Sequence, residues 1–265
     1  MDNRAIGVFD SGLGGLTAVR RMHEIMPNET IIYFGDTGRV PYGTRGRDTI
    51  IKYTRQDVKF LLGHDLKAIL VACNTVSAVA LDLVNAEVPV PMFGVVEPAA
   101  ERAVRTTKNG KIGVIGTAAT IRSGVYERRL HKADPAFEVS AQVCPLFVPL
   151  VENGRVKRGD VVIETVVREY LTPLRDKGVD TLILGCTHYP LLREVIGDFM
   201  GDGVTLIDSG AIAAETLKTA VNPAEGPGGT RYFVSDDPTS FAQLASLFLQ
   251  EDVADQAGLV EISAY

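Results

Sequence analysis

Two segments of this chain each occur twice in the same order, and this internal repeat constrains the fold more than any other feature. IGVFDSG at Ile6–Gly12 is echoed by IGVIGTA at Ile112–Ala118, and KAILVACNT at Lys67–Thr75 is echoed by DTLILGCTH at Asp180–His188. The copies lie too far apart for a solenoid, whose repeats span ~20–50 residues. The pattern therefore predicts two related domains that face each other, each giving one cysteine at a strand end.

Short β-rich segments alternate with longer helical patterns along the chain. Most of these segments are continuous apolar runs, which is typical of strands buried on both faces of a parallel sheet. They are AIGVFD, TIIYFGD, AILVACN, PMFGVVE, KIGVIGT, FEVSAQV, DTLILGC, VTLID and RYFVSD. The clearest helical stripe spans residues 159–174. We therefore predict an α/β protein with two pseudo-symmetric domains, each a mostly parallel sheet flanked by helices.

The segment VTLIDSG at Val204–Gly210 resembles the first strand and turn. We therefore expect the chain to cross back to its first domain there, and the strand RYFVSD to complete that domain. The predicted first domain is discontinuous and comprises residues 1–97 and 208–265, and the second comprises residues 98–207. Because ligands bind outside the carboxyl ends of strands in open α/β sheets, we expect the active site in the cleft between the domains.

Charge and composition exclude several classes of partner. The 265 residues carry a formal net charge of −6, which argues against a duplex nucleic-acid surface. No apolar run approaches the ~20 residues that span a bilayer, and the polar start MDNRAIGVFD lacks a secretion signal. The 3 cysteines are too few for a disulfide framework, so we expect reduced thiols in the cytoplasm. We expect no regulatory segment before the first strand.

Two of the three cysteines stand in matching contexts. Cys73 precedes Asn74 and a helical pattern, and Cys186 precedes a helix that Pro190 can begin. A thiol at a helix N-terminus is expected to have its pKa lowered from about 8.5, because exposed N–H groups and the helix dipole favour the thiolate. Cys144, in QVCPLF, is interpreted as a small buried hydrophobe.

Four reactions can use two thiols that face one cleft. A redox pair lacks a hydride-cofactor motif, and a cysteine phosphatase needs an arginine six residues on, where Val79 and Leu192 stand. Zinc binding by Cys73, Cys186 and His188 stays open, although no C-x-x-C anchor is present. A two-base proton exchange at a carbon, which inverts a stereocentre, also explains why the site is nearly mirror-symmetric.

Four motifs, taken together and in order, resemble glutamate racemase, of the cofactor-independent amino-acid racemases. They are DSGLGG at Asp10–Gly15, VPYG at Val40–Gly43, ACNT at Ala72–Thr75 and GCTHYP at Gly185–Pro190. The resemblance implies an isomerase that interconverts L- and D-glutamate with neither cofactor nor metal. It also implies a cytoplasmic homodimer that supplies D-glutamate for peptidoglycan synthesis, with no nucleic-acid or membrane partner.

The resemblance also assigns roles to individual residues. It implies that Cys73 and Cys186 act as acid and base on opposite faces of the substrate Cα, the first deprotonating the D-isomer and the second the L-isomer. Asp10 and His188 would assist proton movement at the respective thiols, and Glu152 in PLVENG would be a further supporting acid. Thiols and histidine suit such exchange because their protonation can be tuned near neutral pH.

The turn at Asp10–Gly12 is expected to hold the amino-acid substrate beside the first thiol. Its backbone N–H groups and the Ser11 hydroxyl would meet a carboxylate, and the Asp10 carboxylate would meet the ammonium group. Further substrate contacts implied by the resemblance are Tyr42, Gly43, Asn74, Thr75, Thr187 and His188, with Thr117 added as the echo of Ser11.

Two other functions fit the same motifs. A racemase for another acidic amino acid, such as aspartate, would share the two thiols and differ in its side-chain pocket. A small-molecule binding protein would use the cleft without turnover, and replacing its cysteines would change affinity little. Carbon-acid chemistry needs a site closed to water, so we expect the domains to close over the ligand.

Overall fold

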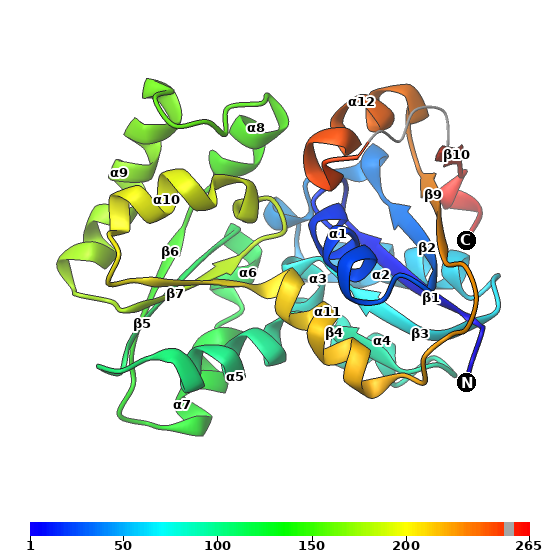
Figure 1. Ribbon diagram of the computed structural model, residues 1–265, viewed down its shortest axis with the longest axis horizontal. Helices are drawn as coiled ribbons and strands as arrows, with labels where there is room; N and C mark the ends of the chain where they lie inside the picture. The colour runs from blue at the N-terminus through cyan, green and yellow to red at the C-terminus, as the bar shows by residue number, and fades with distance from the viewer. Residues whose placement is uncertain (252–256) are drawn as a thin grey trace.

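The computed structural model describes residues 1–251 and 257–265, and their strands form two sheets in which all neighbours run parallel (Figure 1). We call the part of the chain that carries the first of these sheets the first half, and the part that carries the second sheet the second half. The first sheet has the spatial order β10 (Ala257–Leu259), β9 (Gly229–Val234), β2 (Thr30–Gly35), β1 (Ala5–Asp10), β3 (Leu66–Val71) and β4 (Met92–Gly94). The second has the order β6 (Glu138–Val143), β5 (Lys111–Gly116), β7 (Thr181–Gly185) and β8 (Thr205–Asp208).

The order β2-β1-β3-β4 in the first sheet recurs as β6-β5-β7-β8 in the second. This repetition confirms the prediction of two pseudo-symmetric α/β halves. The first sheet is longer because β9 and β10 extend it beyond β2. The strand RYFVSD therefore belongs to the first sheet, as expected, whereas the short β10 was not anticipated. We propose residues 98–207 as the second domain, a range that contains β5 to β7 and all but the last residue of β8.

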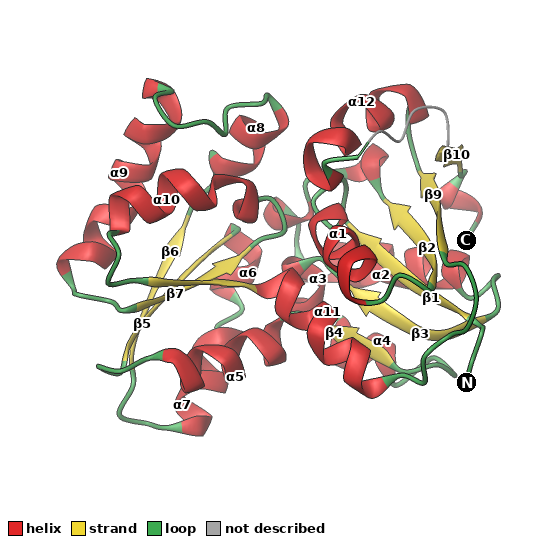
Figure 2. Ribbon diagram, viewed as in Figure 1, coloured by secondary structure: helices red, strands yellow, loops and turns green. Residues whose placement is uncertain are grey.

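Helices lie over both faces of the sheets, as Figure 2 shows. In the first half, Ile6 and Val8 of β1 pack in the core that contains α1, whereas Phe9 packs in the core that contains α2. Buried strands of this kind need apolar residues at successive positions, which explains the continuous apolar runs in the sequence. The helices are α1 (Leu16–Ile25), α2 (Arg47–Leu61), α3 (Asn74–Val79), α4 (Leu81–Asn85), α5 (Val96–Thr106), α6 (Ala118–Arg122), α7 (Val125–Ala133), α8 (Phe147–Glu152), α9 (Val161–Asp176), α10 (Arg193–Met200), α11 (Ser209–Ala220) and α12 (Pro238–Leu249). Short 3₁₀ turns are η1 (Thr37–Arg39), η2 (Tyr42–Thr44), η3 (Tyr189–Leu192) and η4 (Ile262–Ala264).

The chain passes between the two halves twice. It leaves the first sheet after β4 through α5 and returns after β8 through α11, and these two helices pack against each other (Figure 1). Glu215 on α11 accepts hydrogen bonds from Arg21 on α1 at 2.8 Å and from Arg102 on α5 at 2.9 Å. The two crossings therefore lie side by side and are tied to the first half by charged groups.

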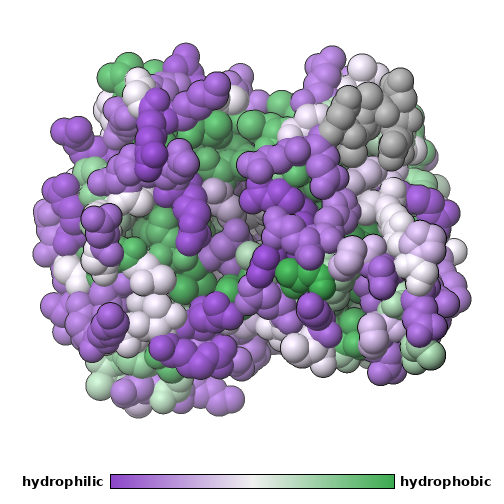
Figure 3. Space-filling view, viewed as in Figure 1, coloured by the Kyte–Doolittle hydropathy of each residue, from purple (hydrophilic) through white to green (hydrophobic). Residues whose placement is uncertain are grey.

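Hydrophilic residues cover most of the face drawn in Figure 3, with hydrophobic patches between them. Some large apolar side chains of the described residues are exposed. They include Leu83, Leu146 and Val161, which lie in different segments. None of the helices in the described ranges combines the length and the apolar character that crossing a membrane requires.

A buried ion pair joins four segments of the chain near the amino-terminal ends of β2 and β3. Lys67 Nζ lies 2.6 Å from Glu29 Oε2, and the two side chains are 2% and 4% exposed. The same ammonium group donates to the carbonyl oxygens of Asp2 and Asn222, each at 2.8 Å. Glu29 Oε1 accepts from the Ala224 amide at 3.0 Å. The pair thus anchors the N-terminal segment and the connection from α11 to β9.

Replacing Lys67 by methionine should destabilise the fold strongly, because it leaves the Glu29 carboxylate buried without its cation. We expect Lys67→Met to lower the free energy of unfolding by about 3–5 kcal/mol, measured by urea denaturation followed by circular dichroism. The control is Arg55→Ala, which removes the exposed Arg55–Glu87 pair and should cost under about 1 kcal/mol. Equal losses in the two variants would contradict this expectation.

Candidate active site

Four of the predicted site residues lie at the carboxyl ends of neighbouring strands, two in each sheet. In the first sheet Asp10 ends β1 and Cys73 follows β3, and these strands are neighbours. In the second sheet Thr117 follows β5 and Cys186 follows β7, which are also neighbours. The chain continues in opposite directions across each sheet from these strands, so both pairs stand at the switch points where α/β proteins bind ligands.

A cavity of about 30 Å³ lies between these strand ends and is lined by loops from both halves. Both Cys73 and Cys186 line it, as do all the other predicted site residues except Asp10 and Glu152. Val40, Pro41 and Val148 complete its wall. Because one water molecule needs ~10–15 Å³ by this measure, the cavity has room for about two. The site as it stands is closed and smaller than an amino acid.

Cys73 stands beside the turn that follows β1. Its thiol donates to the Ser11 hydroxyl with a sulfur–oxygen distance of 3.5 Å. Asp10 is fully buried next to this turn and accepts from the Gly12 amide at 3.1 Å and from the Thr187 hydroxyl at 3.3 Å. Burial raises the pKa of Asp10, although the charge of His188 and the turn amides oppose this. The Gly12 amide, which we expected to meet a substrate carboxylate, therefore holds Asp10.

Cys186 stands beside a histidine and a carboxylate. Its sulfur lies 3.9 Å from His188 Nδ1, and His188 Nε2 lies 3.0 Å from Glu152 Oε1. Glu152, at the end of α8, therefore joins the site through His188 even though it does not line the cavity. A proton on Nε2 that is donated to Glu152 leaves Nδ1 able to accept the thiol proton. The rings of His188 and of Phe248 on α12 lie nearly perpendicular, with their centroids 5.3 Å apart.

The pKa values of the two thiols depart from the sequence-based expectation. Burial raises the pKa of Cys73 to about 11, and the nearby Asp10 carboxylate adds to the rise. Burial likewise raises the pKa of Cys186, in spite of a hydrogen bond from the His188 amide. The expected lowering at helix N-termini was therefore wrong for this closed site, because loss of water outweighs the amide dipoles. Both sulfurs carry their protons here at neutral pH.

Two glycines allow the halves to touch around the cavity. A Cβ atom on Gly14 would lie 2.1 Å from Thr187 Oγ1 and 2.6 Å from His188 Nδ1. A Cβ atom on Gly43 would lie 2.6 Å from the Cβ of Thr117. Any larger residue would push the halves apart, so the glycine in the first turn serves close contact with the second half.

Polar side chains also connect the halves. Thr75 Oγ1 lies 2.9 Å from Thr117 Oγ1, and Thr17 Oγ1 donates to the Thr187 carbonyl at 3.2 Å. The amide group of Asn74 is bound on both sides, since it donates to Ser209 at 3.0 Å and accepts from Tyr126 at 2.6 Å. Asn74 therefore lines the cavity with a side chain whose orientation is fixed by Tyr126 of the second half and by Ser209 at the start of the returning helix α11.

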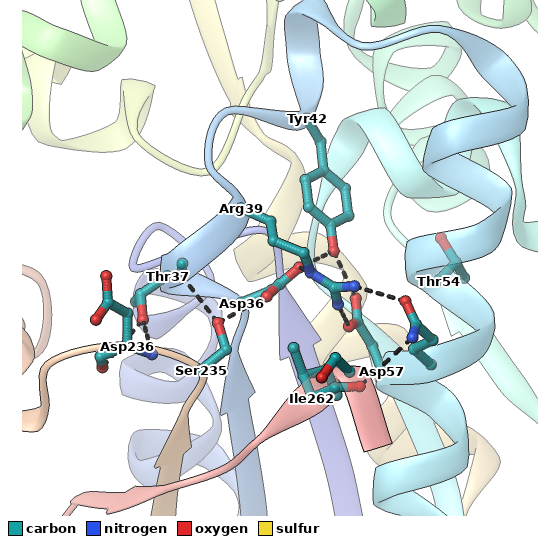
Figure 4. Close-up of polar contacts among 12 residues, drawn as sticks. Asp36, Thr37, Arg39, Tyr42, Thr54, Asp57, Ser235, Asp236 and Ile262 are labelled. Carbon is teal, nitrogen blue, oxygen red and sulfur yellow. Dashed lines mark hydrogen bonds and ion pairs between the residues drawn. The ribbon is translucent and has the colours of Figure 1, made fainter. Parts of the chain in front are cut away.

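The Tyr42 hydroxyl points into a buried polar cluster (Figure 4). The hydroxyl donates to Asp36 and lies 2.9 Å from Asp57 Oδ2, and Arg39 bridges the same two carboxylates. Sequence reasoning missed this cluster. Asp36 ends the predicted strand TIIYFGD and could have been found by that position, whereas Asp57 lies in a helix rich in charged residues and gives no such signal.

The zinc hypothesis named Cys73, Cys186 and His188. Over residues 1–251 and 257–265, no group of three or more His, Cys, Asp or Glu side chains is placed to hold a metal ion. The ring nitrogens of His188 instead face the Cys186 thiol and the Glu152 carboxylate. These contacts leave neither ring nitrogen directed toward Cys73.

A larger groove lies elsewhere on the molecule. It has a volume of about 990 Å³ and is lined by parts of α3, α4, α5 and α7, but by none of the predicted site residues. Its size alone does not mark it as the centre of the chemistry, since the two thiols and their partners surround the smaller cavity.

Comparison with known proteins agrees with this geometry. A model of the Asp/Glu/Hydantoin racemase family matches residues 6–217. A glutamate racemase of Geobacter metallireducens is 45% identical over 258 residues, which is 95% of each chain. The crystal structure of glutamate racemase from Francisella tularensis in complex with D-glutamate has a TM-score of 0.91 at 40% identity, covering 100% of both chains. A glutamate racemase isoform of Bacillus anthracis has a TM-score of 0.93 at 37% identity, covering 98% of both.

The relative and the two solved structures match 95–100% of the chain, and the family model matches the part that carries the second sheet and most of the first. They agree with the resemblance carried by the four sequence motifs. The chain therefore belongs to the Asp/Glu/Hydantoin racemase family, in which its full-length relatives are glutamate racemases.

Proposed function

We propose that this enzyme interconverts L- and D-glutamate by moving a proton on and off Cα with two cysteines and no cofactor. Membership of a racemase family makes the chain an isomerase. One observation carries the two-base mechanism: Cys73 and Cys186 come from equivalent strand ends of opposite halves and line a single cavity. A carbon held between them would meet one sulfur on each face.

The substrate itself supplies the charge that the site lacks. Both thiols are buried, and Asp10 is a carboxylate in their neighbourhood, so the protonated sulfurs are favoured. An amino acid brings an ammonium group, and a nearby positive charge lowers the pKa of a thiol. Binding would therefore bring each thiol closer to the balance between acid and base that proton exchange requires.

In the direction from L- to D-glutamate, Cys186 would act as the base. It loses its proton to His188 Nδ1, and the Glu152 carboxylate stabilises the imidazolium that forms. The Cys186 thiolate then takes the Cα proton while the Cys73 thiol gives its own proton to the opposite face. The product carries the inverted centre and leaves Cys73 as the thiolate. In the reverse direction Cys73 is the base, with Asp10 nearby to assist.

Admitting the substrate requires the halves to separate. Ligand sites for small molecules have volumes of ~300–1,000 Å³, whereas the cavity between the thiols is far smaller. The contacts that must part include Gly14 with Thr187 and Gly43 with Thr117. Closure after binding would exclude water from the carbanion-like transition state, as lids and domains do in other enzymes.

The substrate and the cellular role are inferred from the relatives. Full-length relatives are named glutamate racemases, and one of them was solved with D-glutamate, so we propose glutamate ahead of aspartate. We further propose that the protein is a cytoplasmic homodimer whose D-glutamate enters peptidoglycan synthesis. Its net charge of −6 gives no support for a nucleic-acid partner.

Replacing either cavity cysteine should nearly abolish racemisation. We expect Cys73→Ala and Cys186→Ala each to lower kcat/KM for L-glutamate by about 10²–10⁴-fold, because each removes one of the two proton carriers. The measurement is optical rotation together with Cα deuterium uptake in deuterated water. Cys144→Ala is the matched control, because Cys144 is buried but does not line the cavity.

The same assay, repeated with a chelator and with L-aspartate, separates the racemase from the three alternative functions. A binding protein would show no rotation change with the wild type, a zinc enzyme would lose activity with a chelator, and an aspartate racemase would prefer L-aspartate. Full activity in Cys73→Ala or in Cys186→Ala would refute the two-cysteine mechanism.

The thiols should be slow to alkylate in the enzyme without substrate. Alkylating reagents attack the thiolate, and burial raises the pKa of Cys73 to about 11. The rate of Cys73 modification by iodoacetamide should therefore rise about tenfold per pH unit through pH 9, as followed by mass spectrometry. The reference is the same cysteine in the urea-unfolded chain, whose rate should level off near pH 9. A plateau below pH 8 in the folded enzyme would contradict the raised pKa.

A further inference from the structure

A cluster of buried charged groups lies beneath the loop that forms one wall of the cavity (Figure 4). Arg39 Nε donates to Asp36 Oδ2 at 2.6 Å, and its Nη2 donates to Asp57 Oδ1 at 2.9 Å. The Tyr42 hydroxyl lies between the two carboxylates and bonds to both. Ser235, after β9, donates to Asp36 Oδ1 at 2.7 Å. The cluster therefore joins the loop after β2 to α2 and to the end of β9.

The cluster is buried and needs one more proton than its hydroxyl can supply. Asp36, Tyr42 and Asp57 have no solvent exposure, and the Arg39 side chain is 17% exposed. The Tyr42 oxygen lies within hydrogen-bond distance of two carboxylates, but its single proton can serve only one of them. Asp57 is the group that holds the additional proton, because burial and the charge of Asp36 raise its pKa well above the usual value.

With Asp57 protonated, every bond in the cluster has a donor and an acceptor. Asp57 donates to the Tyr42 oxygen, Tyr42 donates to Asp36, and Arg39 contacts both acids. The charges then balance, since one carboxylate faces one guanidinium. A balanced and fully bonded buried cluster holds its members in one arrangement, whereas a missing partner leaves a costly unpaired group.

The loop that this cluster holds belongs to the cavity. Val40, Pro41, Tyr42 and Gly43 all line it, and Gly43 touches Thr117 of the second half. Tyr42 is the residue that belongs to both the cavity wall and the cluster. Displacing its side chain would therefore move the backbone that faces the ligand.

We propose that Asp57 and Arg39 are positioning residues, which hold the Val40–Gly43 loop in its ligand-binding geometry through the Tyr42 hydroxyl. This inference rests on the proposed racemase function, because it is measured through glutamate turnover. Neither residue touches the cavity. Loss of the Asp57 carboxyl removes the donor to Tyr42 and one acceptor of Arg39, so the loop loses its fixed position.

The expected kinetic signature is a rise in KM with little change in kcat. A displaced loop weakens contact with substrate and transition state alike, and such uniform loss appears in KM. We expect Asp57→Ala to raise KM for both L- and D-glutamate about tenfold, with kcat within about twofold. Asp57→Asn should stay within about twofold of the wild type, because the amide reproduces both the donor to Tyr42 and the acceptor for Arg39.

A matched control lies on the same helix. Thr54 is fully buried on α2, and its hydroxyl donates only to the Ile50 carbonyl of its own helix at 2.8 Å. Thr54→Val should therefore leave KM unchanged, even where its melting temperature falls as far as that of Asp57→Ala. Tyr42→Phe removes the hydroxyl that links cluster and loop, and it should raise KM several-fold. It serves as the second test should Asp57→Ala not fold.

The outcomes are distinguishable. Absence of racemisation by the wild type would defeat the proposed function itself. With an active wild type, the positioning role is overturned by an unchanged KM in folded Asp57→Ala or in Tyr42→Phe. It is equally overturned by an Asp57→Asn variant as impaired as Asp57→Ala, or by a tenfold rise in KM in Thr54→Val.

Discussion

The contact between the carboxyl ends of two parallel sheets is the constraint on which the site depends. Each sheet by itself offers one thiol at the end of a central strand. Only when the turn at Gly14 lies against Thr187, and Gly43 against Thr117, do both thiols border one cavity. The glycines matter because side chains there would occupy the space where the halves meet. The proposed chemistry, which needs two opposed groups, would thus draw them from one strand end in each sheet.

Removal of water is the main influence on the protonation of the Asp10 carboxyl and the two thiols at this contact. Asp10, Cys73 and Cys186 all have raised pKa values, and burial is the largest cause in each case. The buried thiols are therefore mostly protonated at neutral pH in the absence of a ligand. In the proposed mechanism the substrate's own charge would shift these values, so binding and activation would be one event. This coupling would protect the sulfurs from other reagents while no substrate is bound.

Sequence reasoning was most informative for features that depend on residues close together in the chain. Continuous apolar runs identified the central strands, and residues placed directly after them, such as Cys73 and Cys186, could be located at one edge of a sheet. The direction of the thiol pKa shifts could not be found this way, because it depends on burial by the other half. The contact of Asp57 with Tyr42 was equally inaccessible, since it joins a helix to a loop fifteen positions earlier in the chain. The strand β10 is too short to form a recognisable apolar run in the sequence.

The paired crossings of the chain have a consequence for how the halves move. The polypeptide connects them through α5 and through α11, which lie against each other and share Glu215 as a common acceptor for Arg21 and Arg102. Two adjacent covalent links resist sliding and twisting, because either motion would stretch one link against the other. If the halves separate to admit the substrate, as proposed, these links favour rotation about a single axis, and the rim of the cavity farthest from the two helices would travel the greatest distance.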